Sequence, residues 1–168
     1  MNCIVAVDKN WAIGKDNKLL VSIPNDMKFF RETTKGKVVI MGRKTLESFP
    51  GQKPLPNRVN IVITRDMDYK KEGTVIVHSI EEAMEKVEEY KSDDVFVIGG
   101  ASIYRDMLQF CHTAYVTKID AAYDADTYFP NLDELSNWKL EKESEEQTYF
   151  DVEYVFATYT NDKVSLYE

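Results

Sequence analysis

Two stretches of this chain have the same build: an apolar strand, a glycine and the start of a helix. Residues 37–45 place Gly42 after the apolar run, and residues 94–102 place Gly99 and Gly100 after theirs. Apolar runs of this length are typical of strands buried on both faces. Glycine lets a ligand approach the backbone closely, and a helix start presents free N–H groups to an anion. Two such junctions in one small chain indicate a ligand with two phosphate groups, such as a dinucleotide.

Strand patterns and helical patterns alternate along the chain. The expected strands cover residues 2–8, 37–42, 58–64, 74–78, 94–99, 112–119, 137–144 and 149–160. The expected helices cover residues 24–34, 43–48, 79–91 and 101–109. This alternation predicts an α/β fold, with a mostly parallel eight-stranded central sheet and about four flanking helices. The last two strands, joined by a short connection near Gln147, are expected to pair antiparallel as a hairpin at the C-terminal edge.

Two segments between these elements are long and polar, namely residues 9–23 and 120–136. Loops of this length inside a compact domain are usually functional or mobile. Because residues 9–23 come directly before the helix at 24–34, we expect this segment to act as a lid over a site.

Composition argues against several functional classes. The net charge of -8 disfavours nucleic acid or an anionic membrane as the main partner, and no apolar run approaches the ~20 residues of a membrane span. The first residues lack the basic region and cleavage site of a signal peptide. Cys3 and Cys111 form no CxxC pair, and with His78 and His112 they make no metal-binding cluster. We therefore expect a cytoplasmic protein without a disulfide or a metal site.

Asp26 is the acidic residue most suited to a role in catalysis. It lies in the first turn of the helix at 24–34 and shares one face with Met27 and Phe30. An acid there often does no more than complement the helix dipole. In an apolar pocket, however, the pKa of this carboxyl would rise, and the group could bind and help protonate a heterocycle with an amidine-like edge. The sequence alone leaves both interpretations open.

Other candidates carry less information. Thr117 inside a strand and Tyr104 after the second glycine junction fit a core as well as a site. The chain contains neither a P-loop nor the GxGxxG motif of the usual dinucleotide fold. A dinucleotide would therefore have to be held by a different arrangement.

Four segments resemble bacterial dihydrofolate reductases in order and spacing: residues 12–15, 23–30, 39–48 and 97–104. Residues 126–130 also fit. The resemblance covers about residues 1–160 and implies one dihydrofolate reductase-like domain there, with a short extension at 161–168. It implies a cytoplasmic, monomeric enzyme that reduces 7,8-dihydrofolate to 5,6,7,8-tetrahydrofolate with NADPH and binds antifolate inhibitors.

The resemblance also implies substrate-binding residues. Asp26 matches the acid that holds the pterin and assists protonation at N5, and Thr117 matches the threonine that supports this contact. Arg58 matches the arginine that pairs with the α-carboxylate of the glutamate tail, for which a planar guanidinium is well suited. The matches to the pocket wall are Ile4, Val5, Ala6, Met27, Phe30, Phe49, Leu55, Ile98 and Tyr104.

The cofactor-binding residues are implied in the same way. Ala6 and Ile13 match backbone contacts to the nicotinamide carboxamide, and Arg43 and Arg65 match a site for the 2′-phosphate of the adenosine. The full set of matches is Ala6, Ile13, Gly14, Gly42, Arg43, Lys44, Thr45, Thr64, Arg65, His78, Ile98, Gly99, Gly100, Ala101, Ser102 and Ile103.

The chain departs from the family pattern directly before its catalytic helix. Relatives commonly have Leu-Pro-Trp where this chain has Leu19, Leu20 and Val21. The tryptophan normally holds a water near the substrate, whereas the valine side chain cannot donate a hydrogen bond. We therefore expect a different arrangement of water at this point.

Two other functions are compatible with parts of the pattern. One is a related reductase that acts on a ribosyl-pyrimidine in riboflavin synthesis, but Arg58 and the face formed by Asp26 and Phe30 favour a pterin with a glutamate tail. The other is a catalytically silent nucleotide-binding module, for which a missing acid would be the signature. Asp26 is present.

Overall fold

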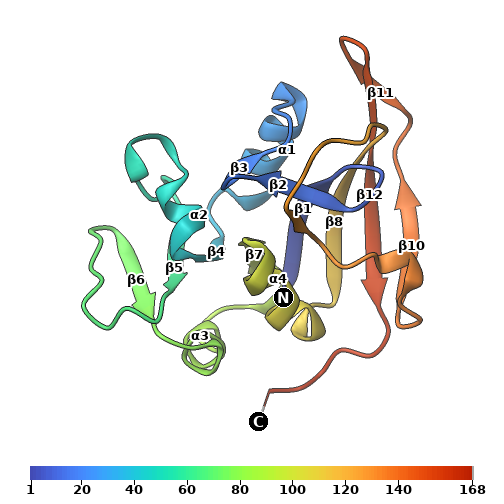
Figure 1. Cartoon of the computed structure of the whole chain (residues 1–168). Coiled ribbons are helices and arrows are strands. Elements are labelled where there is room, and N and C mark those ends of the chain that lie inside the picture. The colour runs from blue at the N-terminus through green and yellow to red at the C-terminus, as the bar shows by residue number, and fades with distance from the viewer. Residues whose placement is uncertain (168) are drawn as a thin grey trace.

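The computed structural model of the protein describes residues 1–167 and is built around one large sheet (Figure 1). Its main strands are β1 (Asn2–Val7), β4 (Val38–Gly42), β5 (Val59–Ile63), β6 (Thr74–Val77), β7 (Val95–Gly99), β8 (Thr113–Ile119), β10 (Trp138–Glu143) and β12 (Val152–Asn161). They lie in the order β10-β12-β8-β1-β7-β4-β5-β6. The six strands from β8 to β6 are parallel to one another, and β12 is antiparallel to both of its neighbours. The expected mostly parallel sheet with an antiparallel edge is confirmed.

Helices cover this sheet on both faces. They are α1 (Pro24–Thr34), α2 (Arg43–Glu47), α3 (Ile80–Val87) and α4 (Ala101–Met107). Short 3-10 turns occupy Pro50–Gln52, Ser92–Asp94, Leu108–Phe110 and Leu132–Glu134. The expected helices are all present, although α3 ends at Val87, four residues earlier than expected. Within residues 1–167, no helix is long and apolar enough to cross a membrane.

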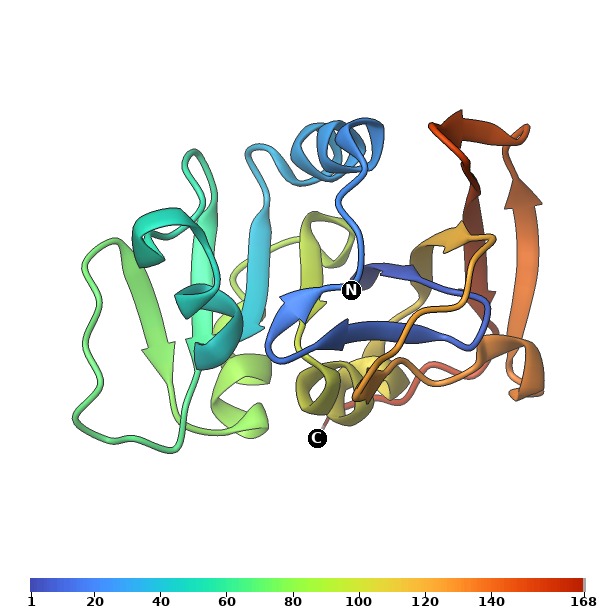
Figure 2. The ribbon, with the colours of Figure 1, turned by 45° about the horizontal axis from the view of Figure 1, so that its top comes forward.

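The central strands are apolar throughout because each of their faces is buried. On β4, Val38 and Ile40 belong to the core cluster that includes residues of α3 and α4. Val39 and Met41, which alternate with them, belong to the cluster that Phe29 of α1 packs against. Figure 2 shows α1 well separated from α3 and α4, with central strands of the sheet between them. Successive side chains of a strand point to opposite faces, so a continuous apolar run satisfies both layers.

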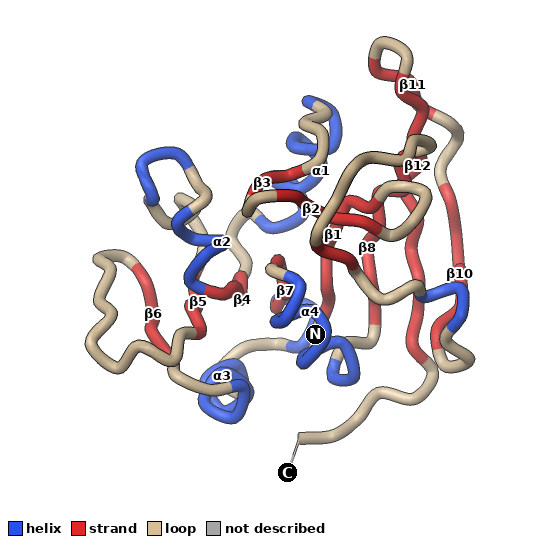
Figure 3. The backbone as a smooth tube through the Cα atoms, in the orientation of Figure 1, coloured by secondary structure: helices blue, strands red, loops and turns tan. Residues whose placement is uncertain are grey.

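The segments expected as long loops, 9–23 and 120–136, contain a small second sheet (Figure 3). It consists of β2 (Ala12–Lys15), β3 (Lys18–Leu19) and β9 (Thr127–Tyr128), with β2 in the middle. Asp16 and Asn17 connect β2 to β3 with φ angles of 51° and 61°. Aspartate and asparagine favour this left-handed conformation, which a two-residue hairpin turn requires. The two segments are therefore joined to each other rather than independent.

The buried carboxylate of Asp8 holds the beginning, or root, of both segments, 9–23 and 120–136. Asp8, directly after β1, accepts hydrogen bonds from the backbone N–H groups of Asn10 (2.8 Å), Ala12 (3.0 Å) and Tyr123 (2.9 Å). Because β1 and β8 are parallel neighbours, the segments that follow them leave the sheet side by side. Asp8 bridges them at that point.

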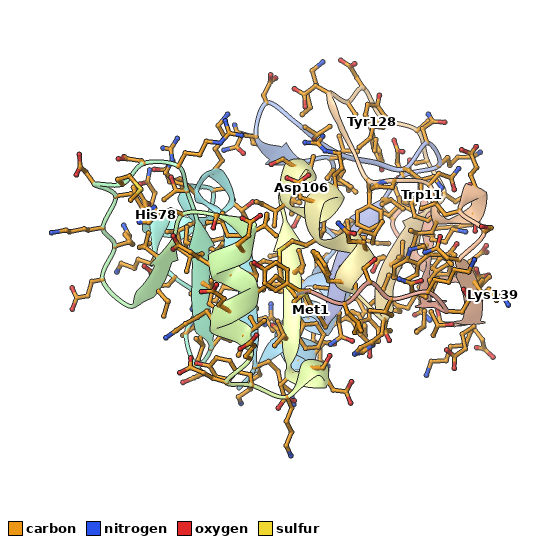
Figure 4. The ribbon with its side chains drawn as sticks, turned by 90° about the horizontal axis from the view of Figure 1, so that it is seen from below. Met1, Trp11, His78, Asp106, Tyr128 and Lys139 are labelled. Atoms are coloured by element: carbon orange, nitrogen blue, oxygen red, sulfur yellow. The ribbon has the colours of Figure 1, made fainter. Side chains whose placement is uncertain are left out.

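Trp11 adds an apolar anchor next to Asp8. Its side chain is buried, and its ring stacks on Phe129 at 6.2 Å between centroids, whereas the neighbouring Tyr128 is half exposed (Figure 4). The beginning of the segment expected as a lid is thus part of the core.

The C-terminal strands pair antiparallel, as the sequence indicates, but their connection is more elaborate than expected. The chain leaves β10 at Ser144, forms β11 (Gln147–Tyr149) and turns at Phe150, which has a φ of 56°. β10 pairs with the far end of β12, and β11 pairs with its beginning. The hairpin therefore extends beyond Gln147, where its turn was expected.

We predict that Asp8→Ala lowers the free energy of unfolding by about 2–4 kcal/mol, because buried N–H groups lose their acceptor. Urea denaturation followed by circular dichroism measures this change. Asp120→Ala is the control, since the side chain of Asp120 forms an exposed ion pair with Lys9 and such pairs contribute about 0–1 kcal/mol. Equal losses in the two variants would contradict the bridging role of Asp8.

Candidate active site

A cleft of about 1580 Å³ opens where the carboxyl ends of β1, β4, β5 and β7 meet. Parallel strands bring their carboxyl ends to one edge of a sheet, which is where α/β folds bind ligands. Every residue assigned above to the substrate pocket or to the cofactor lines this cleft. Thr117 does not line the cleft; it is buried behind the residues that do and donates a hydrogen bond to Asp26.

The two strand–glycine–helix junctions are neighbours in space. β4 and β7 pair directly, with Met41 opposite Gly99, so α2 and α4 begin side by side. A Cβ atom at Gly42 would lie 3.3 Å from Ile103 of α4, and one at Gly99 would lie 3.5 Å from Thr45 of α2. Gly99 also has a φ of 131°, which residues other than glycine rarely adopt. These junctions therefore form one continuous backbone surface in the cleft.

Asp26 enters the cleft at the start of α1. Its Oδ1 accepts a hydrogen bond of 2.6 Å from Oγ1 of Thr117 on β8. Burial raises the pKa of the Asp26 carboxyl above its ordinary value, and the bond from Thr117 works against that rise. Of the two interpretations that the sequence left open, the structure supports an acid in a largely apolar pocket, because Met27 and Phe30 line the cleft beside it.

Tyr104 forms part of the wall but is also a structural residue. Its hydroxyl donates a hydrogen bond of 2.7 Å to the carbonyl oxygen of Ile4. Burial raises the pKa of Tyr104 well above its ordinary value. The hydroxyl is therefore a fixed link between α4 and β1 and stays protonated at neutral pH.

Arg58 is held by the protein before any ligand arrives. Its guanidinium donates to Oγ1 of Thr34 (2.8 Å) and to the carbonyl oxygens of Pro56 (2.7 Å) and Arg31 (3.3 Å). Burial, and secondly the charge of Arg31, lower the pKa of Arg58 from its ordinary value. Guanidinium groups carry five N–H donors, so donors remain for a carboxylate.

Arg31 itself also lines the cleft, and our sequence analysis did not include it. It follows Met27 by four residues and therefore lies on the helix face that was already assigned to the site. That spacing could have identified it.

The positive charge at the other end of the cleft comes from Arg43, Lys44 and Arg65. Arg43 pairs with Glu47 at 3.1 Å, one helical turn away, and its guanidinium lies 6.0 Å from the ring centre of Tyr69. The i, i+4 spacing of the ion pair was readable in the sequence. The contact with Tyr69 was not, because it joins separate elements.

His78 contacts the backbone at the same end of the cleft. Its Nδ1 lies 2.9 Å from the carbonyl oxygen of Thr64. This contact joins the segments that follow β6 and β5 next to the positive charges.

The segment expected as a lid borders the cleft with residues 17–23. Nδ2 of Asn17 donates a 3.4 Å hydrogen bond to the carbonyl oxygen of Lys44. Leu19 at the tip is 70% exposed, in contrast to the buried root at Trp11. Val21 lines the cleft without a polar side-chain atom, as expected from the departure noted above.

We predict that Thr117→Val raises the pKa of Asp26 further, because the lost hydrogen bond stabilises the ionised carboxylate. Carbon-13 NMR of labelled aspartate carboxyl groups measures this pKa. Thr158→Val on β12, opposite Tyr115 rather than beside Asp26, is the control. An unchanged or lowered pKa in Thr117→Val would show that the bond does not act on the carboxylate.

Comparisons with known proteins agree with this geometry. The dihydrofolate reductase family model matches residues 1–161. The dihydrofolate reductase of Bacillus subtilis is 43% identical over 137 residues, which are 82% of this chain and 79% of that protein. For the enzyme of Haemophilus influenzae the identity is 37% over 159 residues, 92% of this chain and 96% of that one.

A solved structure supports the same relationship. Dihydrofolate reductase from Enterococcus faecalis, complexed with NADP(H) and RAB-propyl, superposes with a TM-score of 0.85 at 34% identity. The match covers 96% of this chain and 95% of that one. On its fold, its cleft and these matches, the chain belongs to the dihydrofolate reductase family.

Proposed function

We propose that this protein reduces 7,8-dihydrofolate to 5,6,7,8-tetrahydrofolate with NADPH. The observation that carries the proposal is the position of Asp26. It is a partly buried carboxyl with a raised pKa, in a cleft whose other end combines two glycine–helix junctions with Arg43, Lys44 and Arg65. An acid for a heterocycle and a cationic surface for phosphates thus share one cavity.

The residues at the phosphate end fit a dinucleotide. The first N–H groups of α2 and α4 have no partner within their own helices and can meet a diphosphate. A side chain at Gly42 would crowd Ile103 at 3.3 Å, and one at Gly99 would be strained by the φ of 131°. Arg43 and Arg65 suit the 2′-phosphate that distinguishes NADPH from NADH. When bound, NADPH supplies the hydride that reduces the substrate. The solved relative from Enterococcus faecalis, complexed with NADP(H), supports this assignment.

Asp26 serves the substrate in two ways. Its two oxygens can accept hydrogen bonds from the N3 and 2-amino groups of a pterin, which fixes the ring in one orientation. Its negative charge, held in an apolar pocket, favours the pterin protonated at N5, whose C6 accepts hydride more readily. Thr117 keeps the carboxylate pointed at the ring.

Arg58 orients the other end of the substrate. Its hydrogen bonds to Thr34 and to backbone carbonyls reduce the freedom lost when it binds the α-carboxylate of the glutamate tail. Arg31 adds positive charge at the same place. The lid residues Leu20 and Val21 exclude water from the reacting rings when the segment is closed.

We further propose that residues 1–160 form the catalytic domain and that it works as a monomer in the cytoplasm. Antifolates that present an amidine-like edge would compete with dihydrofolate for Asp26. The bacterial relatives, which align along most of their length with this chain, support these assignments.

The direct test is the loss of NADPH absorbance after dihydrofolate is added to the purified protein. Steady turnover supports the proposal. Nucleotide binding without turnover would favour a silent binding module instead.

We predict that Asp26→Asn slows turnover by about 10²- to 10³-fold at neutral pH, the scale of general acid–base catalysis. The defect should shrink at acidic pH, where dihydrofolate is already protonated in solution. Steady-state rates across the pH range measure this effect, with Asp120→Asn as a surface control. A defect of constant size at all pH values would contradict the assigned role of the acid.

We predict that Arg43→Ala weakens NADPH binding by about tenfold or more and leaves NADH binding almost unchanged, since a charge-assisted hydrogen bond contributes about 1.5–3 kcal/mol. Fluorescence titration with each nucleotide gives the two dissociation constants. Lys86→Ala on α3, outside the cleft, is the control. Similar losses for both nucleotides would show that Arg43 does not recognise the 2′-phosphate.

A further inference from the structure

The first turn of α1 is attached to the sheet by two side-chain hydrogen bonds. The N-cap residue, Ile23, has no side-chain hydrogen bond to the helix within the part of the chain that the structure describes. Instead, two consecutive residues of this turn are tied to the sheet. Asp26 is bonded to Thr117, and Nδ2 of Asn25 donates a hydrogen bond of 3.2 Å to Oη of Tyr154.

The two hydrogen bonds join α1 to neighbouring strands. Thr117 is on β8 and Tyr154 is on β12, and these strands pair with Phe156 opposite Thr117 and Tyr154 opposite Ile119. The two anchor points are therefore two residues apart along the sheet. A turn held at two such points resists both rotation of the helix and its separation from the sheet.

Tyr154 is itself firmly placed. It is 4% exposed, and β11 pairs with β12 on the side opposite β8, with Gln147 facing Tyr154. Its ring meets Phe156 edge to face at 5.6 Å, and Phe156 packs against Phe29 of α1 at 4.8 Å. The longer hairpin formed by β11 and β12 thus supports the strand that carries this hydroxyl group.

We propose that Tyr154 is a positioning residue, which acts through its hydrogen bond with Asn25 to hold the carboxyl group of Asp26 in its buried place beside Thr117. The catalytic consequence rests on the proposed function, but the effect on Asp26 itself does not. The bond restricts the approach of water to the first turn and keeps Asp26 aimed into the cleft.

The groups that face Asp26 are well defined. Thr117 faces it from β8, Tyr104 is an ionisable neighbour on α4, and Met27 and Phe30 flank it on α1. The hydroxyl of Tyr104 is fixed on Ile4 and its pKa is raised, so it stays neutral near the pH at which Asp26 titrates. Loosening the turn would admit water to Asp26 and also weaken its bond from Thr117. Because burial is the larger of these two opposing influences, the pKa of this carboxyl would then fall toward its ordinary value.

The test uses Tyr154→Phe, Asn25→Ala and the double variant of the full chain. We expect each single variant to lower the pKa of Asp26 in a carbon-13 NMR titration without ligand. We also expect single-turnover hydride transfer to slow by about three- to tenfold, the effect of one lost hydrogen bond, with an unchanged dissociation constant for NADPH. The double variant should match the single variants, because all three remove the same bond.

Tyr159→Phe is the matched control. Tyr159 is also a buried tyrosine of β12, but its hydroxyl donates to Asp133 at 2.8 Å, away from α1. This variant removes a hydroxyl that donates to Asp133 and accepts a 3.1 Å hydrogen bond from Nζ of Lys118, and it should leave the pKa of Asp26 unchanged. Because Asn25 is exposed, Asn25→Ala tests the bond even in the event that Tyr154→Phe does not fold.

The outcomes separate the inference from the proposed function. An unchanged pKa of Asp26 in both single variants, or a change equal to that in Tyr159→Phe, overturns the positioning role. Additive effects in the double variant also overturn it. If the wild-type protein fails to reduce dihydrofolate, the proposed function falls, while the titration of Asp26 still decides whether Tyr154 positions it.

Discussion

Burial of both faces of the parallel sheet is the constraint from which the site follows. It requires apolar strands in the middle, and it makes β1, β4, β5 and β7 end at the same edge. Polar groups that must stay accessible then collect at that edge, where the strands stop. The glycines at the ends of β4 and β7 and the helices that follow them are therefore brought together by the sheet, although Gly42 and Gly99 are 57 positions apart in the sequence.

Burial of the Asp26 carboxyl raises its pKa and also lowers the stability of the folded protein. Because the pKa of this carboxyl is raised in the folded protein, ionisation is easier in the unfolded chain. The cost to stability is absent below the unfolded pKa, grows as pH rises through that value, and is complete above the folded one. Thr117 reduces this cost by favouring the ionised form. An acid that served only stability would be better placed in water.

The sequence predicts most of this fold because its signals are local. Continuous apolar runs mark the central strands, and the helical pattern within 79–91 marks α3. The small sheet was missed because β3 and β9 have two residues each, too few to show a period. The pairing of Asp26 with Thr117 spans 91 positions, so only the family resemblance indicated it. The contact of Asn25 with Tyr154 had no sequence signal at all.

The segment expected as a lid is held differently at its two ends. Its root is fixed by Asp8 and by the buried ring of Trp11, and β2 is paired to β9. At its tip, Leu19 is largely exposed, the N–H of Asp16 donates to Asp126 (3.0 Å), and Asn17 contacts α2 through one long hydrogen bond. Opening at the tip would break that weak contact and leave the buried root intact. Such an opening would leave Asp26 in place, because the sheet holds it separately through Thr117.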